Sequence, residues 1–351
     1  SVILTLLVSC SNQNTQPEIK TVKGNSDIPA NQQLVSYLET YGNYINSYEA
    51  PALVDAEELK SQLKNNRWHL IDIRSEVEFE KGHIGRAHHV SFSELPFYLS
   101  DSIKAAVYDH IIIIDKDGQS SGYATSLLRL LGYGNVYNLK FGMASWNKEF
   151  SNYWTDQISS EYEAMLDTIQ NQLPPVTNQL PEINLESKNP DQILKERIHK
   201  LFQEGPEKAA ILRDDLLAEY DNYFLVNYST IARYKSIHLK NSLLFLNRKS
   251  LLLDGDLTRL PLDKPIVIYC MSGHKSAYVT AYLRVLGYDA RTLQFGLNGL
   301  VHELLKEKEW MAFSIEKHSF DFPVITGQEV HELEVYLNEK PQQDSTQNDS
   351  I

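Results

Sequence analysis

The feature that most constrains the fold of this 351-residue chain is an internal repeat with a spacing of 155 residues. Nine of ten positions compared across this spacing carry the same amino acid in both copies, and only the pair Asp115 and Cys270 differs. A repeat of this length, in a chain long enough for two or three ordinary domains, predicts two domains of the same fold. The compared positions are Asp115, Gly118, Ser121, Tyr123, Thr125, Leu128, Arg129, Leu131, Gly132 and Tyr133 in the first copy, and Cys270, Gly273, Ser276, Tyr278, Thr280, Leu283, Arg284, Leu286, Gly287 and Tyr288 in the second.

Each copy has short apolar runs that are followed by helical patterns. Ile111–Ile114 and Ile266–Tyr269 are uncharged runs of the length and composition expected of buried parallel strands. A helix is expected to end near Leu131 in the first copy, and Ser276–Leu286 predicts a helix that stops at Gly287 in the second. Earlier in the chain, Ala52–Val54 and Trp68–Ile73 predict strands, and a helix is expected to begin after Asp55.

Cys270 lies where the chemistry of the second copy is expected, between the end of a predicted strand and the start of a predicted helix. The backbone N–H groups of residues 271–276 can form an anion-holding nest, to which the helix N-terminus adds partial positive charge. His274 is a cation when it is protonated, and Lys275 is a cation at neutral pH. Each of these influences favours the thiolate form of Cys270. Gly273 supplies the backbone freedom that a curled loop requires. The alternative is an inert core cysteine, which the polar sequence after Cys270 disfavours.

The loop resembles the active-site loop of the rhodanese family of sulfurtransferases, which has the form C-x-x-G-x-[KR]-S. A second rhodanese signature, D-x-R-x(4)-F-x-x-G-H-I-x-G-A, is similar to the sequence from Asp72 to Ala87. The resemblance implies two α/β domains, each with a central parallel sheet flanked by helices. It also implies that Asp72 and Arg74 brace the catalytic loop. His83 is then a scaffold residue, so that no metal is assigned to it or to the neighbouring His88 and His89.

Phosphatases with a Cys–Arg loop are the competing family, because they share the order strand, cysteine loop and helix. Their signature needs five residues between the cysteine and an arginine, whereas four residues separate Cys270 from Lys275 and Ser276 follows. The loop therefore lacks the bidentate arginine that grips a phosphoryl group. A single sulfane sulfur suits the narrower loop better.

The two copies have diverged in complementary ways. The first keeps the D-x-R and G-H-I residues, but Asp115 replaces the nucleophile, Ser120 replaces Lys275, and Asp117 adds negative charge. We therefore predict that the first copy is non-catalytic, with a degenerate site at Asp115. The second copy keeps the loop but has Asn227 and Ser229 in place of the motif Asp and Arg, which predicts reduced or specialised activity.

The resemblance implies a transfer of sulfane sulfur through a persulfide on Cys270, without a cofactor. The donor would be a small anion such as thiosulfate, and the acceptor cyanide, a thiol or a thiol protein. The expected catalytic residues are Cys270 and Lys275, and the loop that holds the persulfide comprises Met271, Ser272, Gly273, His274 and Ser276. Two interpretations of His274 stay open, a protonated residue that assists electrostatically and a solvent-facing loop residue.

Two functions of other classes remain open. In one, the chain is a non-enzymatic binding or scaffold module of the cell envelope, and Cys270 is a relic. In the other, Cys270 senses persulfide or peroxide without turnover. A low thiol pKa without sulfur turnover would favour the sensor, and ordinary alkylation kinetics with a buried thiol would favour the scaffold.

Charge and the N-terminal sequence predict the cellular context. A formal net charge of −13 argues against a nucleic-acid partner. Residues 1–9 are apolar and resemble the back half of a bacterial lipoprotein signal, with Cys10 as the lipid-modified residue. The alternative is an ordinary signal or anchor fragment with Cys10 present by chance. We expect a lipid-anchored protein of the bacterial cell envelope that faces the periplasm and contacts the membrane only through its lipid.

The predicted organisation has six parts. They are a partial lipoprotein signal (1–9), a tether (10–48), a non-catalytic rhodanese-like domain (49–155), a helical and Pro-rich linker (156–204), a rhodanese-like domain with the catalytic cysteine (205–312), and a C-terminal extension and tail (313–351). Within these parts, helices are expected at residues 33–48, 159–172, 191–203 and 328–339.

Overall fold

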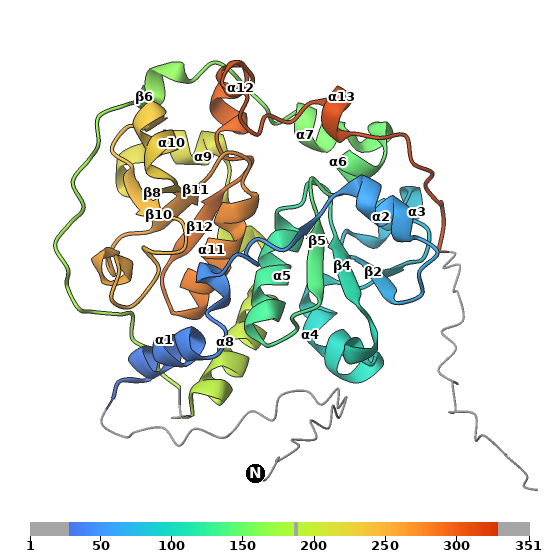
Figure 1. Cartoon of the computed structure of the whole chain (residues 1–351), viewed down its shortest axis with the longest axis horizontal. Helices are drawn as coiled ribbons and strands as arrows, with labels where there is room; N and C mark the ends of the chain where they lie inside the picture. The colour runs from blue at the N-terminus through green and yellow to red at the C-terminus, as the bar shows by residue number, and fades with distance from the viewer. Residues whose placement is uncertain (1–27, 186–188, 329–351) are drawn as a thin grey trace, which may run out of the picture.

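The computed structural model describes residues 28–185 and 189–328, and these form two α/β units side by side (Figure 1). Each unit contains a five-stranded sheet in which every pair of neighbouring strands is parallel. The expected fold class, two domains with central parallel sheets flanked by helices, is therefore confirmed.

The two sheets have the same topology. The first has the order β1-β5-β4-β2-β3, and the second has the order β7-β12-β11-β8-β10 when it is followed from its opposite edge. The repeat in the sequence is thus a repeat of the whole strand order. The strands are β1 (Leu53–Val54), β2 (Trp68–Asp72), β3 (Ala87–His89), β4 (His110–Ile114) and β5 (Val136–Leu139) in the first copy, and β7 (Ala210–Ile211), β8 (Phe224–Ser229), β10 (Leu243–Leu246), β11 (Ile266–Tyr269) and β12 (Ala290–Leu293) in the second.

Helices cover the faces of both sheets, as the connection of parallel strands requires. Those of the first copy are α2 (Ala56–Gln62), α3 (Glu76–Lys81), α4 (Leu95–Phe97), α5 (Ser120–Leu130), α6 (Met143–Trp146) and α7 (Asn152–Thr155). Those of the second copy are α9 (Arg213–Ala218), α10 (Ile231–Ser236), α11 (His274–Val285) and α12 (Asn298–Glu307).

The two copies meet along the helices α5 and α11, which lie next to each other in the middle of the molecule (Figure 1). Ser126 Oγ donates to the Tyr278 carbonyl at 3.0 Å across this contact. Tyr278 Oη lies 2.5 Å from Asn138 Oδ1 and 2.9 Å from the Ala52 carbonyl oxygen, and its single proton can be donated to either. Buried apolar side chains from both sheets, from α5 and from α11 belong to one continuous cluster. The copies therefore share a hydrophobic core.

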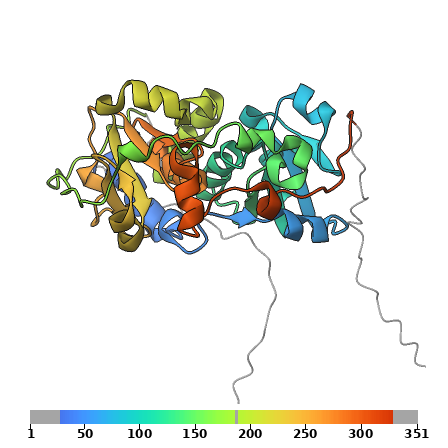
Figure 2. The same cartoon turned by 90° about the horizontal axis from the view of Figure 1, so that it is seen from above.

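The N-terminal end of the described chain packs near the second copy, and the C-terminal end packs on the first copy. Helix α1 (Ala30–Thr40) packs against α8 (Pro190–Glu204), which leads into the second copy. After α12 and α13 (Ile315–His318), the chain returns over the first copy, as the red segment in Figures 1 and 2 shows. There Ile325 forms an antiparallel bridge with His83, and Asp321 forms one with Asn147.

The segment between the copies differs from the prediction. Residues 159–172 were expected to be helical, but they contain only a short 3-10 turn (Glu163–Met165) and the strand β6 (Leu166–Asp167). Strand β6 pairs with β9 (His238–Leu239), and the Ser159 N–H donates to the Asn298 carbonyl at 3.1 Å. Contacts with the second copy thus replace the local helix.

The other helix predictions can be compared with the described residues. The helix expected at 191–203 is present as α8. The helix expected at 33–48 is α1, which begins and ends earlier and is followed by a 3-10 turn at Tyr44–Asn46. The helix expected at 328–339 and the polar tail lie almost entirely outside the described residues.

Candidate active site

Cys270 directly follows β11, whose four residues are all buried. Gly273 has a φ of 82°, in the left-handed region, and stands immediately before α11. The turn at Gly273 connects the Cys270 loop to the N-terminus of α11, as the sequence pattern predicts. Cys270 is 7% exposed, so its thiol is buried within the loop rather than on the surface.

The hydroxyl groups of Ser276 and Thr292 lie next to the Cys270 thiol and hold the loop by hydrogen bonds. Cys270 Sγ lies 3.7 Å from Ser276 Oγ, to which it can donate. Ser276 Oγ in turn donates to the Gly273 carbonyl at 2.9 Å and lies 2.7 Å from Thr292 Oγ1 on β12. Ser276 therefore connects the thiol, the loop backbone and the neighbouring strand.

Hydrogen bonds from the turn that follows β12 hold the backbone of the Cys270 loop. The Leu297 N–H donates to the Cys270 carbonyl at 3.1 Å. Asn298 donates to the Met271 carbonyl through its backbone N–H at 3.1 Å and through Nδ2 at 2.7 Å. Hydrogen bonds from this turn thus hold both carbonyls of the loop.

A cavity of about 100 Å³ opens over Cys270. It is mainly apolar, and the first copy contributes two of its residues, Pro51 and Leu53. The rest of its lining comes from the second copy and contains no carboxylate: Tyr228, Ser229, Arg233, Asn247, Cys270, Met271, Ser272, His274, Lys275 and Met311.

Two cationic side chains line this cavity, Lys275 and Arg233. Burial lowers the pKa of Lys275, and the nearby Cys270 acts in the opposite direction. Among the described residues neither side chain forms an ion pair. Arg233 is exposed and lies near the Trp310 ring, 5.7 Å from its centre. The sequence analysis missed Arg233, although it lies one helical turn beyond Ser229, where the family motif has arginine.

His274 fits neither of its two interpretations. It is 2% exposed, and burial lowers the pKa of its imidazole to about 3. The ring is therefore neutral at physiological pH and is not solvent-facing. Its Nε2 accepts the Phe141 N–H of the first copy at 3.1 Å, and its Nδ1 lies 3.0 Å from Ser272 Oγ. His274 is a contact between the copies.

In the first copy, the side chain of Asp115 fills the site from within. Its carboxylate accepts the Gly118 N–H at 2.6 Å, the Ser121 N–H at 2.9 Å and the Ser121 hydroxyl at 2.9 Å. Burial raises the pKa of Asp115, although these three hydrogen bonds oppose the shift. A loop occupied by its own carboxylate cannot receive a donor anion.

The Asp72–Arg74 pair does not brace the loop as expected. Arg74 Nη2 donates to Asp72 at 2.6 Å and to the Gly82 carbonyl at 2.8 Å, so the buried pair supports the segment before β3. His83 stacks on Phe79 with ring centres 3.8 Å apart. The replacement of the pair by Asn227 and Ser229 in the second copy therefore removes a support that lies beside the loop, not on it.

No group of three or more His, Cys, Asp or Glu side chains suited to a metal ion occurs among residues 28–185 and 189–328. Cys10 lies outside the described residues. Within the described part of the chain, no helix is long and apolar enough to cross a bilayer.

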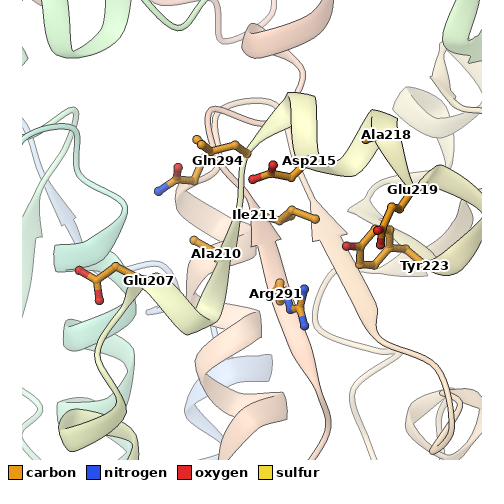
Figure 3. Close-up of a pocket in the computed structure, with 10 residues that line it drawn as sticks. Glu207, Ala210, Ile211, Asp215, Ala218, Glu219, Tyr223, Arg291 and Gln294 are labelled. Atoms are coloured by element: carbon orange, nitrogen blue, oxygen red, sulfur yellow. The ribbon is translucent and has the colours of Figure 1, made fainter.

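A second cavity, of about 540 Å³, lies away from Cys270 (Figure 3). It lies beside β7 at the edge of the second sheet and carries the carboxylates of Glu207, Asp215 and Glu219. None of its residues belongs to the Cys270 loop, and it contains no nucleophilic side chain.

Comparison with known proteins agrees with the fold and with the repeat. The Rhodanese-like domain family matches residues 55–149 and 212–303, together more than half of the chain. A thiosulfate sulfurtransferase of Stutzerimonas stutzeri, GlpE, is 34% identical over 82 residues, which cover 23% of this chain and 72% of that protein. GlpE of Pseudomonas aeruginosa is 31% identical over 109 residues, which cover 31% of this chain and 93% of that protein.

Solved structures with the same type of domain are more distant in sequence. A rhodanese-related protein of Thermoplasma volcanium is 24% identical, with a TM-score of 0.24, over 28% of this chain and 92% of that one. A thiosulfate sulfurtransferase of Pseudomonas aeruginosa is 15% identical, with a TM-score of 0.30, over 81% of this chain and 47% of that one.

Proposed function

Because the chain belongs to the rhodanese-like family, with two such domains in tandem, we propose that it is a sulfurtransferase whose second copy carries the reaction. The Cys270 thiolate attacks the outer sulfur of a small donor anion such as thiosulfate. The S–S bond of the donor breaks, sulfite leaves with the bonding electron pair, and Cys270 becomes a persulfide. Cyanide or a thiolate then attacks the outer sulfur of the persulfide, takes it as thiocyanate or a new persulfide, and restores the Cys270 thiolate.

The observation that carries this proposal is the carboxylate bound in the loop of the first copy. The N–H groups of Gly118 and Ser121 hold the Asp115 carboxylate at 2.6 and 2.9 Å. Gly273 and Ser276 are the equivalent residues of the second copy, where the shorter side chain of Cys270 leaves the same N–H groups for another anion. A loop of this geometry therefore suits the anionic outer sulfur of a persulfide.

The charges and the size of the cavity support a small anionic donor. Lys275 and Arg233 line a space of about 100 Å³ that contains no carboxylate. Ligand pockets for drug-sized molecules are larger, roughly 300–1,000 Å³, so this cavity suits a molecule of a few heavy atoms. The neutral His274 contributes no charge, and Lys275 is the residue placed to stabilise the donor's oxyanion or the persulfide.

The experiment that tests the proposal is intact-mass measurement of the purified protein before and after thiosulfate, with Cys270→Ser as the control. We expect a gain of one sulfur, about 32 Da, on the wild type only, and its loss after addition of cyanide. An accessible thiol that reacts with an alkylating agent but gains no sulfur would contradict sulfur transfer from thiosulfate. That result would favour the thiol sensor instead.

We also propose that the protein acts in the bacterial cell envelope, facing the periplasm and held there by a lipid on Cys10. The apolar residues 1–9 and the polar sequence after Cys10 support this. In cells that express the protein with its native leader, incorporation of a labelled fatty acid should depend on Cys10. Equal labelling of a Cys10→Ala variant would contradict the proposal.

A further inference from the structure

The loops of the two copies exchange a matched pair of hydrogen bonds. His274 Nε2, in the second copy, accepts the Phe141 N–H of the first copy at 3.1 Å. Gln119 Oε1, in the first copy, accepts the Phe295 N–H of the second copy at 2.7 Å. Gln119 and His274 occupy equivalent positions of the repeat, as do Phe141 and Phe295, so each copy reaches across to the same place in the other.

Two glycines leave room for this exchange. A Cβ atom on Gly118 would lie 2.5 Å from His274 Nε2, and a Cβ atom on Gly273 would lie 2.1 Å from Gln119 Oε1. Both distances are far below contact, so the crossing side chains occupy the space that any larger residue would need. The contact between the copies is therefore built into the Cys270 loop itself.

A short path connects Gln119 with the nucleophile. Phe295, whose N–H donates to Gln119 Oε1, has a φ of 60°, a left-handed conformation that is unfavourable for a residue other than glycine. Gly296 follows, and a Cβ atom there would lie only 2.1 Å from the Cys270 carbonyl oxygen. The Leu297 N–H then donates to that same carbonyl. Any shift of Phe295 therefore moves the backbone that holds Cys270.

We propose that Gln119, in the non-catalytic first copy, is a positioning residue for the Cys270 loop. Its side chain holds Phe295 in the left-handed conformation and so fixes the turn that supports the Cys270 carbonyl. The first copy has lost its own nucleophile but completes the site of the second. This inference rests on the sulfur transfer proposed above, because it concerns the same loop.

Three variants test the proposal. Gln119→Met keeps the length of the side chain and removes both the acceptor for the Phe295 N–H and the side-chain amide that interacts with Asp117. Gln119→His should restore an acceptor, because His274 plays the same part at the equivalent position. Ser126→Ala is the matched control, since it removes a hydrogen bond between α5 and α11 without touching the loop.

The measurements are kcat and KM for thiosulfate, the alkylation rate of Cys270, and the temperature of unfolding. We expect Gln119→Met to lower kcat about tenfold with less than about a twofold change in KM, because misplacing a reacting group by a fraction of an ångström costs rate more than binding. The alkylation rate of Cys270 should change as well. Gln119→His should recover most of the lost kcat, and Ser126→Ala should keep the wild-type kcat even if it unfolds at a lower temperature.

Two results would overturn the proposal. One is a Gln119→Met variant with wild-type kcat and alkylation rate. The other is a Ser126→Ala variant that loses as much kcat as Gln119→Met, because a general weakening of the contact between the copies would then explain both. If the wild type gains no sulfur from thiosulfate, the proposed function fails, whereas the alkylation rates still decide the role of Gln119.

Discussion

At the scale of single residues, His274 and Lys275 are adjacent in the sequence and can both carry positive charge, but their surroundings give them different roles. His274 is neutral, whereas Lys275 is cationic. The imidazole is enclosed between the copies and has a pKa of about 3, so it acts as a hydrogen-bond partner. The ammonium group of Lys275 lines the cavity over Cys270. The positive charge of the site therefore comes from Lys275 and from Arg233, not from the histidine.

The lowered pKa of Lys275 predicts how donor binding depends on pH. Lysine is charged below its pKa, and burial moves that pKa below its ordinary value of 10.5. As the pH rises, the charge that attracts an anionic donor is lost earlier than for an exposed lysine, so KM for thiosulfate should rise on the alkaline side. Lys275→Arg should remove this rise, because arginine stays charged. A KM that rises equally in both proteins would contradict the assignment.

Arg233 should bind the donor without taking part in the chemistry. Arg233→Gln is expected to raise KM for thiosulfate about fivefold, since an exposed charge contributes up to about 1 kcal/mol, and to leave kcat unchanged. High salt should reduce the difference through screening. Lys235→Gln removes the same charge from α10 but does not line the cavity, so it should leave KM unchanged. Equal effects of the two variants would mean that only the overall charge matters.

At the scale of elements, the loop after β11 and the turn after β12 form one unit. Each contributes a backbone conformation that favours glycine, Gly273 with a φ of 82° and Gly296 with a φ of 53°. The two glycines also lie close together, because a Cβ atom on Gly296 would come within 2.9 Å of the Gly273 nitrogen. The geometry of the nucleophile thus depends on a turn that contains no reactive group.

Substitutions at Gly296 and Gly132 distinguish a steric clash with the Cys270 loop from the backbone strain that a positive φ causes in any residue with a Cβ atom. Gly296→Ala should lower the rate of persulfide formation at least about a hundredfold, because its methyl group would displace the Cys270 carbonyl. Gly132→Ala is the matched control: φ there is 99°, but no atom lies within 4 Å of the added Cβ, so it should cost only about 1–2 kcal/mol of stability. Mass measurement after thiosulfate and thermal unfolding compare the two. Normal persulfide formation in Gly296→Ala would refute the role of this turn.

At the scale of the whole molecule, the two copies are joined by more than their shared core. Helix α1 packs on α8, and the Glu39 carboxylate accepts the Leu253 N–H of the second copy. At the other end, Trp146 of the first copy donates from its indole N–H to the Pro323 carbonyl at 2.9 Å. Each end of the chain therefore ties the two copies together.

This arrangement predicts that the two copies unfold together. One continuous cluster of buried side chains includes Ile113 of the first sheet and Ile268 of the second, so unfolding of either copy would expose apolar surface of the other. Scanning calorimetry should show one transition, with the calorimetric enthalpy equal to the van't Hoff enthalpy. Two resolved transitions, or tryptophan fluorescence that changes at a different temperature from the heat absorption, would contradict a shared core.

The sequence by itself determined the repeated α/β architecture and the place of Cys270 between a strand and a helix. Both follow from local order along the chain: apolar runs that form buried strands, a glycine at the turn, and a helix after Cys270. The loss of the nucleophile in the first copy was equally visible, because Asp115 replaces it at the equivalent position. These features depend on residues close to one another in sequence, and the strand, the glycine turn and the helix occur in both copies.

Only the tertiary structure decided what surrounds the loop. Ser159–Gln172 is not a helix, because β6 pairs with β9 of the second copy. His274 is neutral because the first copy buries it, and Gln119 reaches Phe295 across 176 positions of the sequence. Burial and pairing between distant segments are set by how the copies pack, and no local pattern records that. The place of Cys270 in the fold could thus be predicted from the sequence, whereas the contacts of its loop with the first copy could not.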